Sequence, residues 1–165
     1  MDPPDWLNLA PWAAALEASA LGEWVRSSGW AYPTINVLHL LGLVLLVGPM
    51  LLFDLRLLGV GRLFALPEVS AALTPWAVAG LLLLLPTGVL LFSADAGPLL
   101  DNRLLQFKLL LIAVGIANAL LFRRLWSRRL HDWDWQPPRI GRLQAMLSAL
   151  CWLAAGTLGR LIAYD

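Results

Sequence analysis

Four long apolar segments alternate with polar connections along the chain, and their expected bounds are residues 34–53, 74–92, 104–122 and 143–164. A helix needs about 20 mainly apolar residues to cross a bilayer. Each segment has roughly that length, so the pattern predicts four membrane spans. Short connections join antiparallel neighbours in an up-and-down bundle. We therefore expect an all-α fold, an integral membrane four-helix bundle in which residues 1–165 form one domain.

A further helix is predicted before the first span, over residues 11–27. Pro11 suits the first turn of a helix, and Leu16, Ala20 and Trp24 recur at helical spacing on one face. The acidic residues of the segment lie on other faces. An amphipathic helix can lie in the interface plane of a membrane, so we expect an N-terminal interfacial helix that caps the bundle.

Composition agrees with a membrane protein. The chain is 59% hydrophobic and only 14% charged, with a mean hydropathy of +0.71, whereas soluble domains carry about 25% charged residues. Most of the surface is therefore expected to meet lipid. The single cysteine, Cys151, excludes an intrachain disulfide and a multi-cysteine metal centre. The basic residues lie beside the spans, so no nucleic-acid partner is expected.

The arginines predict the orientation of the spans. They gather in the connection between the third and fourth spans and in the connection after the first, whereas acidic residues surround the opposite ends. The positive-inside rule therefore predicts a protein of the bacterial inner (cytoplasmic) membrane with both termini periplasmic. The basic residues of the two connections are Arg56, Arg62, Arg123, Arg124, Arg128, Arg129, Arg139 and Arg142.

Three ionisable residues interrupt the apolar segments or lie at their edges: His39, Lys108 and Arg160. Ionisable side chains in hydrocarbon are costly and usually face a bundle interior or a polar cavity. At about 1.5 Å of rise per residue, all three lie roughly 5–12 Å below the outer surface. Thr87 of the second span lies at a similar height. We therefore expect one polar site in the outer leaflet.

Several chemistries fit such a site. A neutral imidazole can ligate haem iron or another metal ion, and Lys108 and Arg160 would then pair with haem propionates or donate to a quinone carbonyl. The structural alternative is that the two cations snorkel to the interface and that His39 bonds a neighbouring carbonyl. The other histidine, His131, is expected on the far side of the bilayer. Haem would therefore need a single protein ligand, a histidine–lysine pair, or a site shared between protomers.

A second polar group is expected at the cytoplasmic ends of the helices, and it comprises Asp54, Arg56 and Asn118. Asp54 is placed to pair with an arginine such as Arg123 or Arg124, and Asn118 can bond across helices. These residues are interpreted as structural, fixing the helix ends. Proton relay is the alternative.

Several short motifs resemble a family of unknown function that consists of small bacterial membrane proteins. The resemblance spans nearly the whole chain and implies four spans. More distantly, the first-span His39-Leu40-Leu41-Gly42 and the spacing of Lys108 and Asn118 are similar to two other groups: the membrane domain of copper-resistance proteins of the CopD type, and the membrane-bound protoporphyrinogen oxidase family. The second of these implies haem-associated roles for His39 and Lys108. The motifs are Arg26-Ser27-Ser28-Gly29-Trp30-Ala31-Tyr32-Pro33, His39-Leu40-Leu41-Gly42, Asp54-Leu55-Arg56-Leu57-Leu58-Gly59, Thr87-Gly88-Val89-Leu90-Leu91-Phe92, Phe107-Lys108, Asn118-Ala119 and Gly159-Arg160-Leu161-Ile162-Ala163-Tyr164.

The leading functional hypothesis is a redox-associated subunit that binds haem b or a quinone at His39, Lys108 and Arg160. The second is a non-catalytic membrane anchor or assembly subunit for a periplasmic or membrane partner, and a homo-oligomer is compatible with either. The third is metal or small-solute transport. Copper handling usually needs more sulfur than Met50 and Met146 provide, and few intramembrane polar groups leave little room for a pathway. Enzymatic activity stays open.

Overall fold

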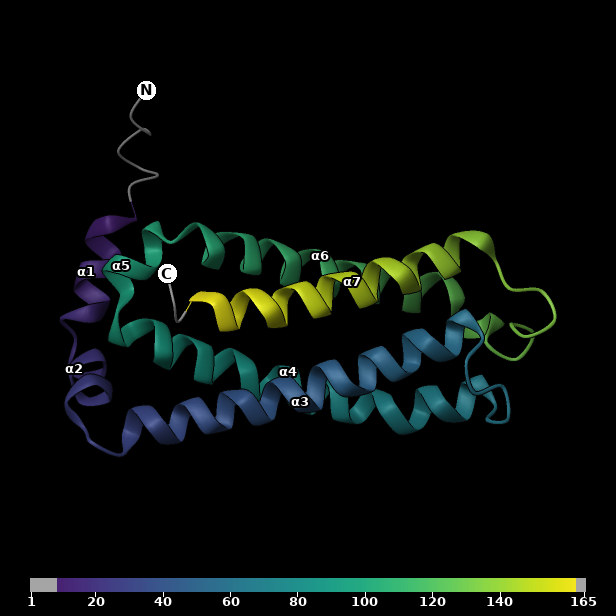
Figure 1. Ribbon diagram of the computed structural model, residues 1–165, viewed down its shortest axis with the longest axis horizontal. Helices are drawn as coiled ribbons and strands as arrows, with labels where there is room; N and C mark the ends of the chain where they lie inside the picture. The colour runs from purple at the N-terminus through teal and green to yellow at the C-terminus, as the bar shows by residue number, and fades with distance from the viewer. Residues whose placement is uncertain (1–8, 163–165) are drawn as a thin grey trace, which may run out of the picture.

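A computed structural model describes residues 9–162, and in this range the chain forms helices and no strand (Figure 1). Residues 1–8 and 163–165 lie outside the description. The all-α prediction is therefore confirmed for the described residues. The elements are α1 (Ala10–Glu17), α2 (Ala20–Ser27), α3 (Ala31–Leu58), α4 (Leu66–Ala94), α5 (Ala96–Asp101), α6 (Arg103–Trp126), the short 3-10 helix η2 (Ser127–Arg129) and α7 (Arg139–Leu161).

Three helices are long and apolar enough to cross a membrane: α3, α4, and α6 continued through η2. Within their most apolar stretches only 17%, 28% and 11% of residues are buried, so most of their side chains face outward, as lipid contact requires. The fourth predicted span, α7, has 23 residues but is less apolar. Polar residues on its buried face, among them Gln144 and Ser148, account for part of that difference.

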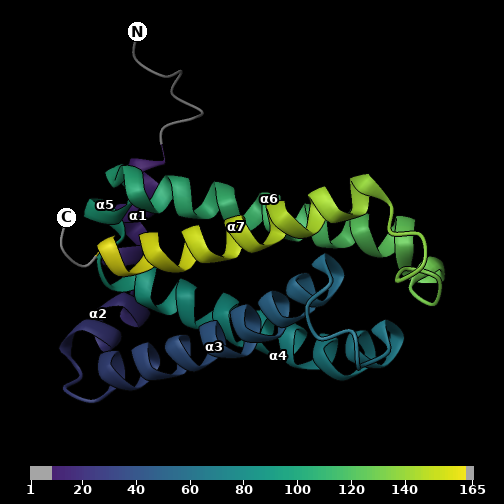
Figure 2. The ribbon, with the colours of Figure 1, turned by 45° about the vertical axis from the view of Figure 1, so that its right-hand side comes forward.

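The long helices form two hairpins that join side by side. Helix α3 packs along α4, and α6 packs along α7, while contacts between α3 and α7 hold the two pairs together. The backbones of α4 and α6 scarcely approach each other, and the short α5 links them (Figure 2). We call the end that carries α1, α2 and α5 the outer end. The inner end carries the connections 59–65 and 127–138.

Helices α3 and α4 cross in close contact at two glycines. A Cβ atom on Gly80 would lie 2.5 Å from the backbone nitrogen of Leu46 and 2.7 Å from the carbonyl oxygen of Gly42. Only glycine permits backbones to approach this closely, a device that is common between membrane helices. The crossing sets the spacing of the two helices on which part of the candidate site is built.

Tryptophans fill the middle and the inner end of the bundle. Trp152 of α7 packs against Leu46 and Ala77 in the middle, where Gly115 of α6 leaves room for its ring. At the inner end Trp133 is 2% exposed, and its indole Nε1 donates to the carbonyl of Leu57 at 3.0 Å. The cluster around it contains Leu57, Leu66, Phe122, Leu130 and Ala145.

The segment predicted as one interfacial helix is divided into two at the outer end. Ser19 adopts an extended backbone conformation, its Oγ donates to the carbonyl of Leu16 at 2.6 Å, and it accepts from the amide of Gly22 at 3.2 Å. The hydroxyl thus caps the start of α2, which breaks the expected single helix over 11–27. Helix α2 then packs against the end of α4.

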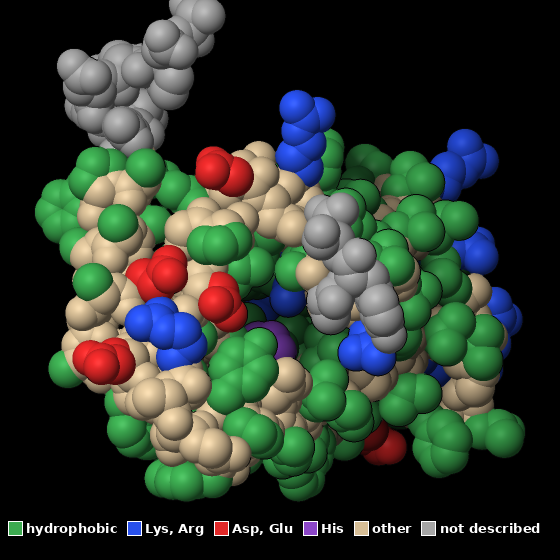
Figure 3. Space-filling model, turned by 60° about the vertical axis from the view of Figure 1, so that its left-hand side comes forward, with side chains coloured by type: hydrophobic (Ala, Val, Ile, Leu, Met, Phe, Trp, Pro, Cys, Tyr) green, Lys and Arg blue, Asp and Glu red, His purple; other side chains and the backbone are tan. Residues whose placement is uncertain are grey.

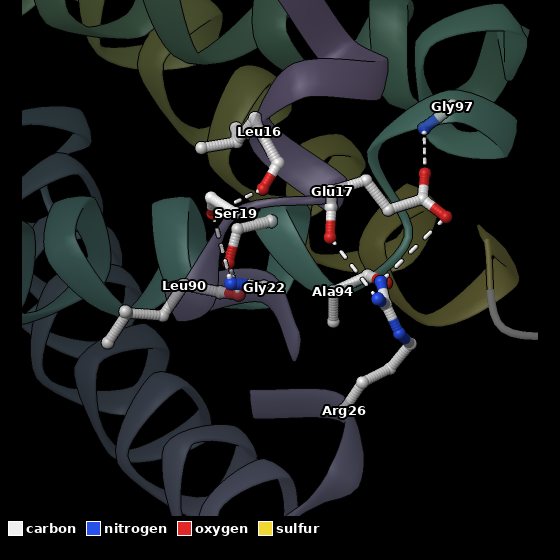
Figure 4. A network of polar contacts seen from close by, with 9 residues as sticks. Leu16, Glu17, Ser19, Gly22, Arg26, Leu90, Ala94 and Gly97 are labelled. Atoms are coloured by element: carbon white, nitrogen blue, oxygen red, sulfur yellow. Dashed lines mark hydrogen bonds and ion pairs between the residues drawn. The ribbon is translucent and has the colours of Figure 1, made fainter. Parts of the chain in front are cut away.

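We call α1 and α2 the outer cap, and one arginine bonds it to the rest of the bundle (Figure 4). Arg26 donates to the carbonyl of Ala94 at 2.8 Å and to the carbonyl of Glu17 at 3.2 Å, and its guanidinium also lies 3.8 Å from the Glu17 carboxylate. The same carboxylate accepts from the amide of Gly97 in α5 at 2.9 Å. The cap therefore bridges α4 and α5 above the outer ends of the long helices.

Candidate functional site

His39 of α3 and Thr87 of α4 form a hydrogen bond between helices, with 2.9 Å between Nδ1 and Oγ1. Thr87 is 4% exposed, and its hydroxyl donates to the carbonyl of Leu83 at 2.6 Å. A threonine hydroxyl has one hydrogen to donate. Because that hydrogen is directed at Leu83, Thr87 accepts from His39, and Nδ1 carries the imidazole proton. The lone pair of the neutral ring is then on Nε2.

Lys108 approaches the same region from α6. Its side chain is half-buried and lies against α7, since a Cβ atom added to Gly159 would meet Lys108 Nζ at 3.1 Å. Its charge is near enough to act on the His39 imidazole. Helices α3, α4, α6 and α7 thus each contribute to one region, through His39, Thr87, Lys108 and Gly159. The heights of the residues in the sequence predict His39, Thr87 and Lys108 in this region, whereas Gly159 was not predicted.

Arg160 follows Gly159 in the last turn of α7, at the same end as Lys108, and its side chain is exposed. Figure 3 views this outer end, where a histidine side chain is visible in a hollow between apolar side chains, with a basic side chain deeper in the hollow. His131, the other histidine, is exposed in the connection at the inner end. The two histidines therefore lie at opposite ends of the molecule.

At the inner end Arg56 joins three parts of the chain. Its guanidinium donates to both carboxylate oxygens of Asp134, at 2.9 and 2.6 Å, and its Nε donates to the carbonyl of Phe64 at 2.8 Å. These bonds hold the pKa of Asp134 below its usual value. The pair ties both inner connections to the end of α3. Asp134 was not among the residues predicted from the sequence, because 78 positions separate it from Arg56.

The predicted pairing of Asp54 with Arg123 or Arg124 is wrong. Asp54 is 3% exposed and forms no ion pair with any residue in the range 9–162. Both arginines are exposed on α6, whereas Asp54 is buried near Ser148 of α7. The two arginines therefore direct their charges away from the helix interface that contains the carboxyl group.

Asn118 links α6 to α7. Its Nδ2 donates to the carbonyl of Gln144 at 2.9 Å, which is the kind of cross-helix bond expected of it. The side-chain oxygen of Gln144 in turn accepts from Trp126 Nε1 at 2.7 Å. Gln144 and Trp126 were not predicted as partners of Asn118. A glutamine at helical spacing from Ser148 within an apolar segment is a signal that could have identified Gln144.

No cluster of three or more histidine, cysteine, aspartate or glutamate side chains within residues 9–162 is arranged to hold a metal ion. His39 Nε2 is an imidazole nitrogen at the outer end that can ligate a metal-containing group. A single imidazole nitrogen suits a metal ion that is already held by a porphyrin ring, as in haem, or an organic molecule that forms hydrogen bonds.

The model of a family of unknown function, DUF6644, matches residues 11–165. No curated protein and no solved structure matches the chain. The protein belongs to the DUF6644 family.

Proposed function

We propose that this member of the DUF6644 family is a multi-pass protein of the bacterial inner membrane, with α7 as its fourth span. The 23 residues of α7 give a helix of about 34 Å, enough to cross the hydrocarbon layer, and α7 packs along α6 and α3. Most arginines lie at the inner end, which supports a cytoplasmic position for that end and periplasmic termini. Helices α1 and α2 would then lie at the periplasmic interface.

We further propose that the protein is a redox-associated subunit that holds haem b or a quinone in the outer leaflet. The observation that carries this proposal is the bond from His39 to Thr87, which supports a proton on Nδ1, so that the neutral ring has its lone pair on Nε2. A metal-binding histidine typically donates its other ring nitrogen in this way, which fixes the orientation of the ring. The same Nε2 can accept a hydrogen bond from the hydroxyl of a quinol.

The other residues of the site have complementary roles in the proposal. Lys108 would donate to a quinone carbonyl or pair with a haem propionate. Arg160 would bind a propionate nearer the interface. Either group supplies electron transfer when bound, while the protein provides the binding atom, its orientation and the surrounding charges.

The test is to purify the protein from a haem-replete host in lipid nanodiscs, record its visible spectrum and analyse extracted lipids for quinone. We expect a Soret band or a stoichiometric quinone. His39→Ala should abolish the signal, because it removes the binding atom. His131→Ala is the matched control and should retain the signal, since His131 lies at the inner end. Thr87→Val, which removes the hydroxyl but keeps the shape, should weaken binding without abolishing folding.

Two outcomes would contradict the proposal. Absence of both haem and quinone from a folded protein would refute the binding of a redox group. If a group is bound and His39→Ala retains it as well as His131→Ala does, the assignment of His39 is wrong.

A second candidate is a membrane anchor or assembly subunit for a periplasmic partner. The observation that favours it is the outer cap, where Trp12 is 77% exposed and Trp30 is 65% exposed. Large aromatic side chains are enriched where proteins bind one another, and also at membrane interfaces. In this case a stoichiometric periplasmic protein should co-purify even when His39 and Lys108 are both replaced by alanine. Replacing Trp12 by alanine should then release the partner.

A further inference from the structure

Three buried side-chain atoms within the described residues have no hydrogen-bond partner: Asp54 Oδ2, Ser148 Oγ and Trp152 Nε1. Asp54, Ser148 and Trp152 are each 3% exposed. Buried polar atoms are nearly always paired, so an unpaired one needs an explanation. Here the two that belong to Asp54 and Ser148 come from facing helices, α3 and α7.

The position of Asp54 along α3 determines the side of the membrane with which it can exchange a proton. It lies four residues before the inner end of α3 at Leu58, a distance of about 6 Å along the helix axis. It lies 23 residues after the outer end at Ala31, or about 35 Å away. His39 is 15 residues away, or about 22 Å. Asp54 is therefore separate from the outer site and close to the inner surface.

No cation is directed at this carboxyl group from the described parts of the neighbouring helices. On its own helix, Arg56 is engaged by Asp134 and by the carbonyl of Phe64. On α7, Ser148 and the thiol of Cys151 are buried. Arg139 and Arg142 of the same helix are exposed, and Arg142 donates to the carbonyl of Leu58 at 3.4 Å. The remaining charged side chains near the inner ends of α4 and α6 are exposed, and they are Glu68, Arg123 and Arg124.

The energetics favour a neutral carboxyl group here. An unpaired carboxylate in a protein interior is strongly disfavoured, whereas a protonated carboxyl is uncharged and has one hydrogen to donate. The hydroxyl of Ser148 can accept that hydrogen, because it lies near Asp54 and its oxygen has no hydrogen-bond partner among the described residues. A bound cation such as calcium would need about 6–8 oxygen ligands, and Asp54 and Ser148 supply far fewer.

We propose that Asp54 is an intramembrane proton-binding site, positioned by Ser148, that exchanges its proton with water at the inner end of the bundle. The carboxyl group holds the proton on one oxygen, releases it to a water molecule when it ionises, and takes a proton back from water when it becomes neutral again. This site does not depend on haem or quinone, and its test is independent of the outer site.

The experiment is labelling with dicyclohexylcarbodiimide, an apolar reagent that reacts with protonated carboxyl groups in membranes, followed by peptide mass spectrometry. The full chain in nanodiscs is labelled over a series of pH values. We expect Asp54 to be the carboxyl group that this reagent labels within the spans, with labelling that declines as pH rises. A water-soluble carbodiimide should instead label exposed groups such as Glu68.

Variants and spectroscopy keep the test independent of folding defects. Asp54→Asn should lose the label and also the infrared carbonyl band of a protonated carboxylic acid. Ser148→Ala removes the acceptor of the carboxyl hydrogen, so the pH at which labelling declines should shift. Ser93→Ala is the matched control, because Ser93 is equally buried but bonded to the carbonyl of Leu90; it should leave the pH profile unchanged.

The proposal fails if Asp54 stays unlabelled by the apolar reagent while the folded wild-type protein shows no protonated-carboxyl band. It also fails if sodium or calcium ions protect Asp54 from the reagent in a saturable manner at constant pH, because the site would then bind a cation. A profile that Ser148→Ala and Ser93→Ala leave equally unchanged would remove Ser148 from the site.

Discussion

Replacing Gly80 by alanine should separate α3 from α4 and loosen the outer site. The added Cβ would lie 2.5 Å from the backbone nitrogen of Leu46, and ordinary van der Waals contact begins near 3.4 Å. The neighbouring atoms belong to backbone, so no side-chain rotation can relieve the contact. The helices must therefore move apart locally by about 0.9 Å, the difference between the two distances. Overpacking of this kind costs about 1–3 kcal/mol.

The same displacement would reach the histidine. Thr87 follows Gly80 by seven residues, two turns of α4 on the same face. If the separation persists to that level, the distance from His39 Nδ1 to Thr87 Oγ1 increases from 2.9 Å to about 3.8 Å, beyond the range of a hydrogen bond. The imidazole would then lose the bond that fixes its tautomer.

The stability of Gly80→Ala can be measured by the loss of helical circular dichroism as sodium dodecyl sulfate is titrated into mixed micelles. Gly156→Ala is the matched control, because nothing lies within 4 Å of the Cβ it would add. Alanine is favoured over glycine in a helix by up to about 1 kcal/mol, so the control should equal or exceed the wild type. Nitrogen-15 NMR of the imidazole reports the bond from Nδ1. If Gly80→Ala unfolds at the same sodium dodecyl sulfate concentration as Gly156→Ala and keeps the wild-type imidazole signal, the reasoning is wrong.

Three further predictions concern the inner end and the cap. The hydrogen bonds from Arg56 lower the pKa of Asp134. They therefore stabilise the folded state fully at pH values above the ordinary pKa of 3.8, and this stabilisation is lost as pH falls through the lowered pKa. Asp134→Asn should remove this acid dependence from thermal unfolding curves. Trp133→Phe removes the donor to the α3 carbonyl and leaves a void, so it should destabilise the protein by about 1–3 kcal/mol, while Trp135→Phe, at a side chain 88% exposed, should have no effect. Ser19→Ala removes the cap of α2 and should cost about 0.5–2 kcal/mol, seen as faster amide hydrogen exchange in that helix.

Each of these predictions has a contrary outcome. Unfolding curves of Asp134→Asn that keep the acid dependence of the wild type would assign it to another carboxyl group. Equal stabilities for Trp133→Phe and Trp135→Phe would show that the indole bond and its packing contribute little. Unchanged exchange in Ser19→Ala would mean that contacts with α4, rather than the cap, hold α2.

The long helices were predictable because apolar length is a strong signal that local sequence carries by itself. The expected first span, residues 34–53, is part of α3, whose further extent to Ala31 and Leu58 includes polar and charged residues that hydropathy cannot assign. Arg56 is an example, since only its partners in distant connections show why it is buried. The break at Ser19 was missed because the apolar spacing continues across it, and the capping bonds of a single hydroxyl decide where the helix ends.

For the outer site, the sequence predicted the depth in the membrane that its residues share, but not their contacts. Counting residues along antiparallel helices placed His39, Thr87, Lys108 and Arg160 at one level. The structure brings the first three into one region, while Arg160 is exposed at the same end. The tautomer of His39 was not predictable, because it follows from the bond between Thr87 and Leu83. The pairing of Asp54 was predicted wrongly because the rotation of α3 about its own axis directs Asp54 to α7. The sequence leaves this rotation undetermined, since the segment is apolar on nearly every face.

The division of the long helices into two hairpins has a consequence for how the protein is made. Each hairpin consists of helices adjacent in the sequence, α3 with α4 and α6 with α7, and each pair packs along its own length. A ribosome therefore completes the first pair before the second begins to emerge, and each pair can insert and close on its own. Contacts between α3 and α7 come last, since they need the whole chain. Two polypeptides divided near α5 should accordingly reassemble in the membrane when they are produced together.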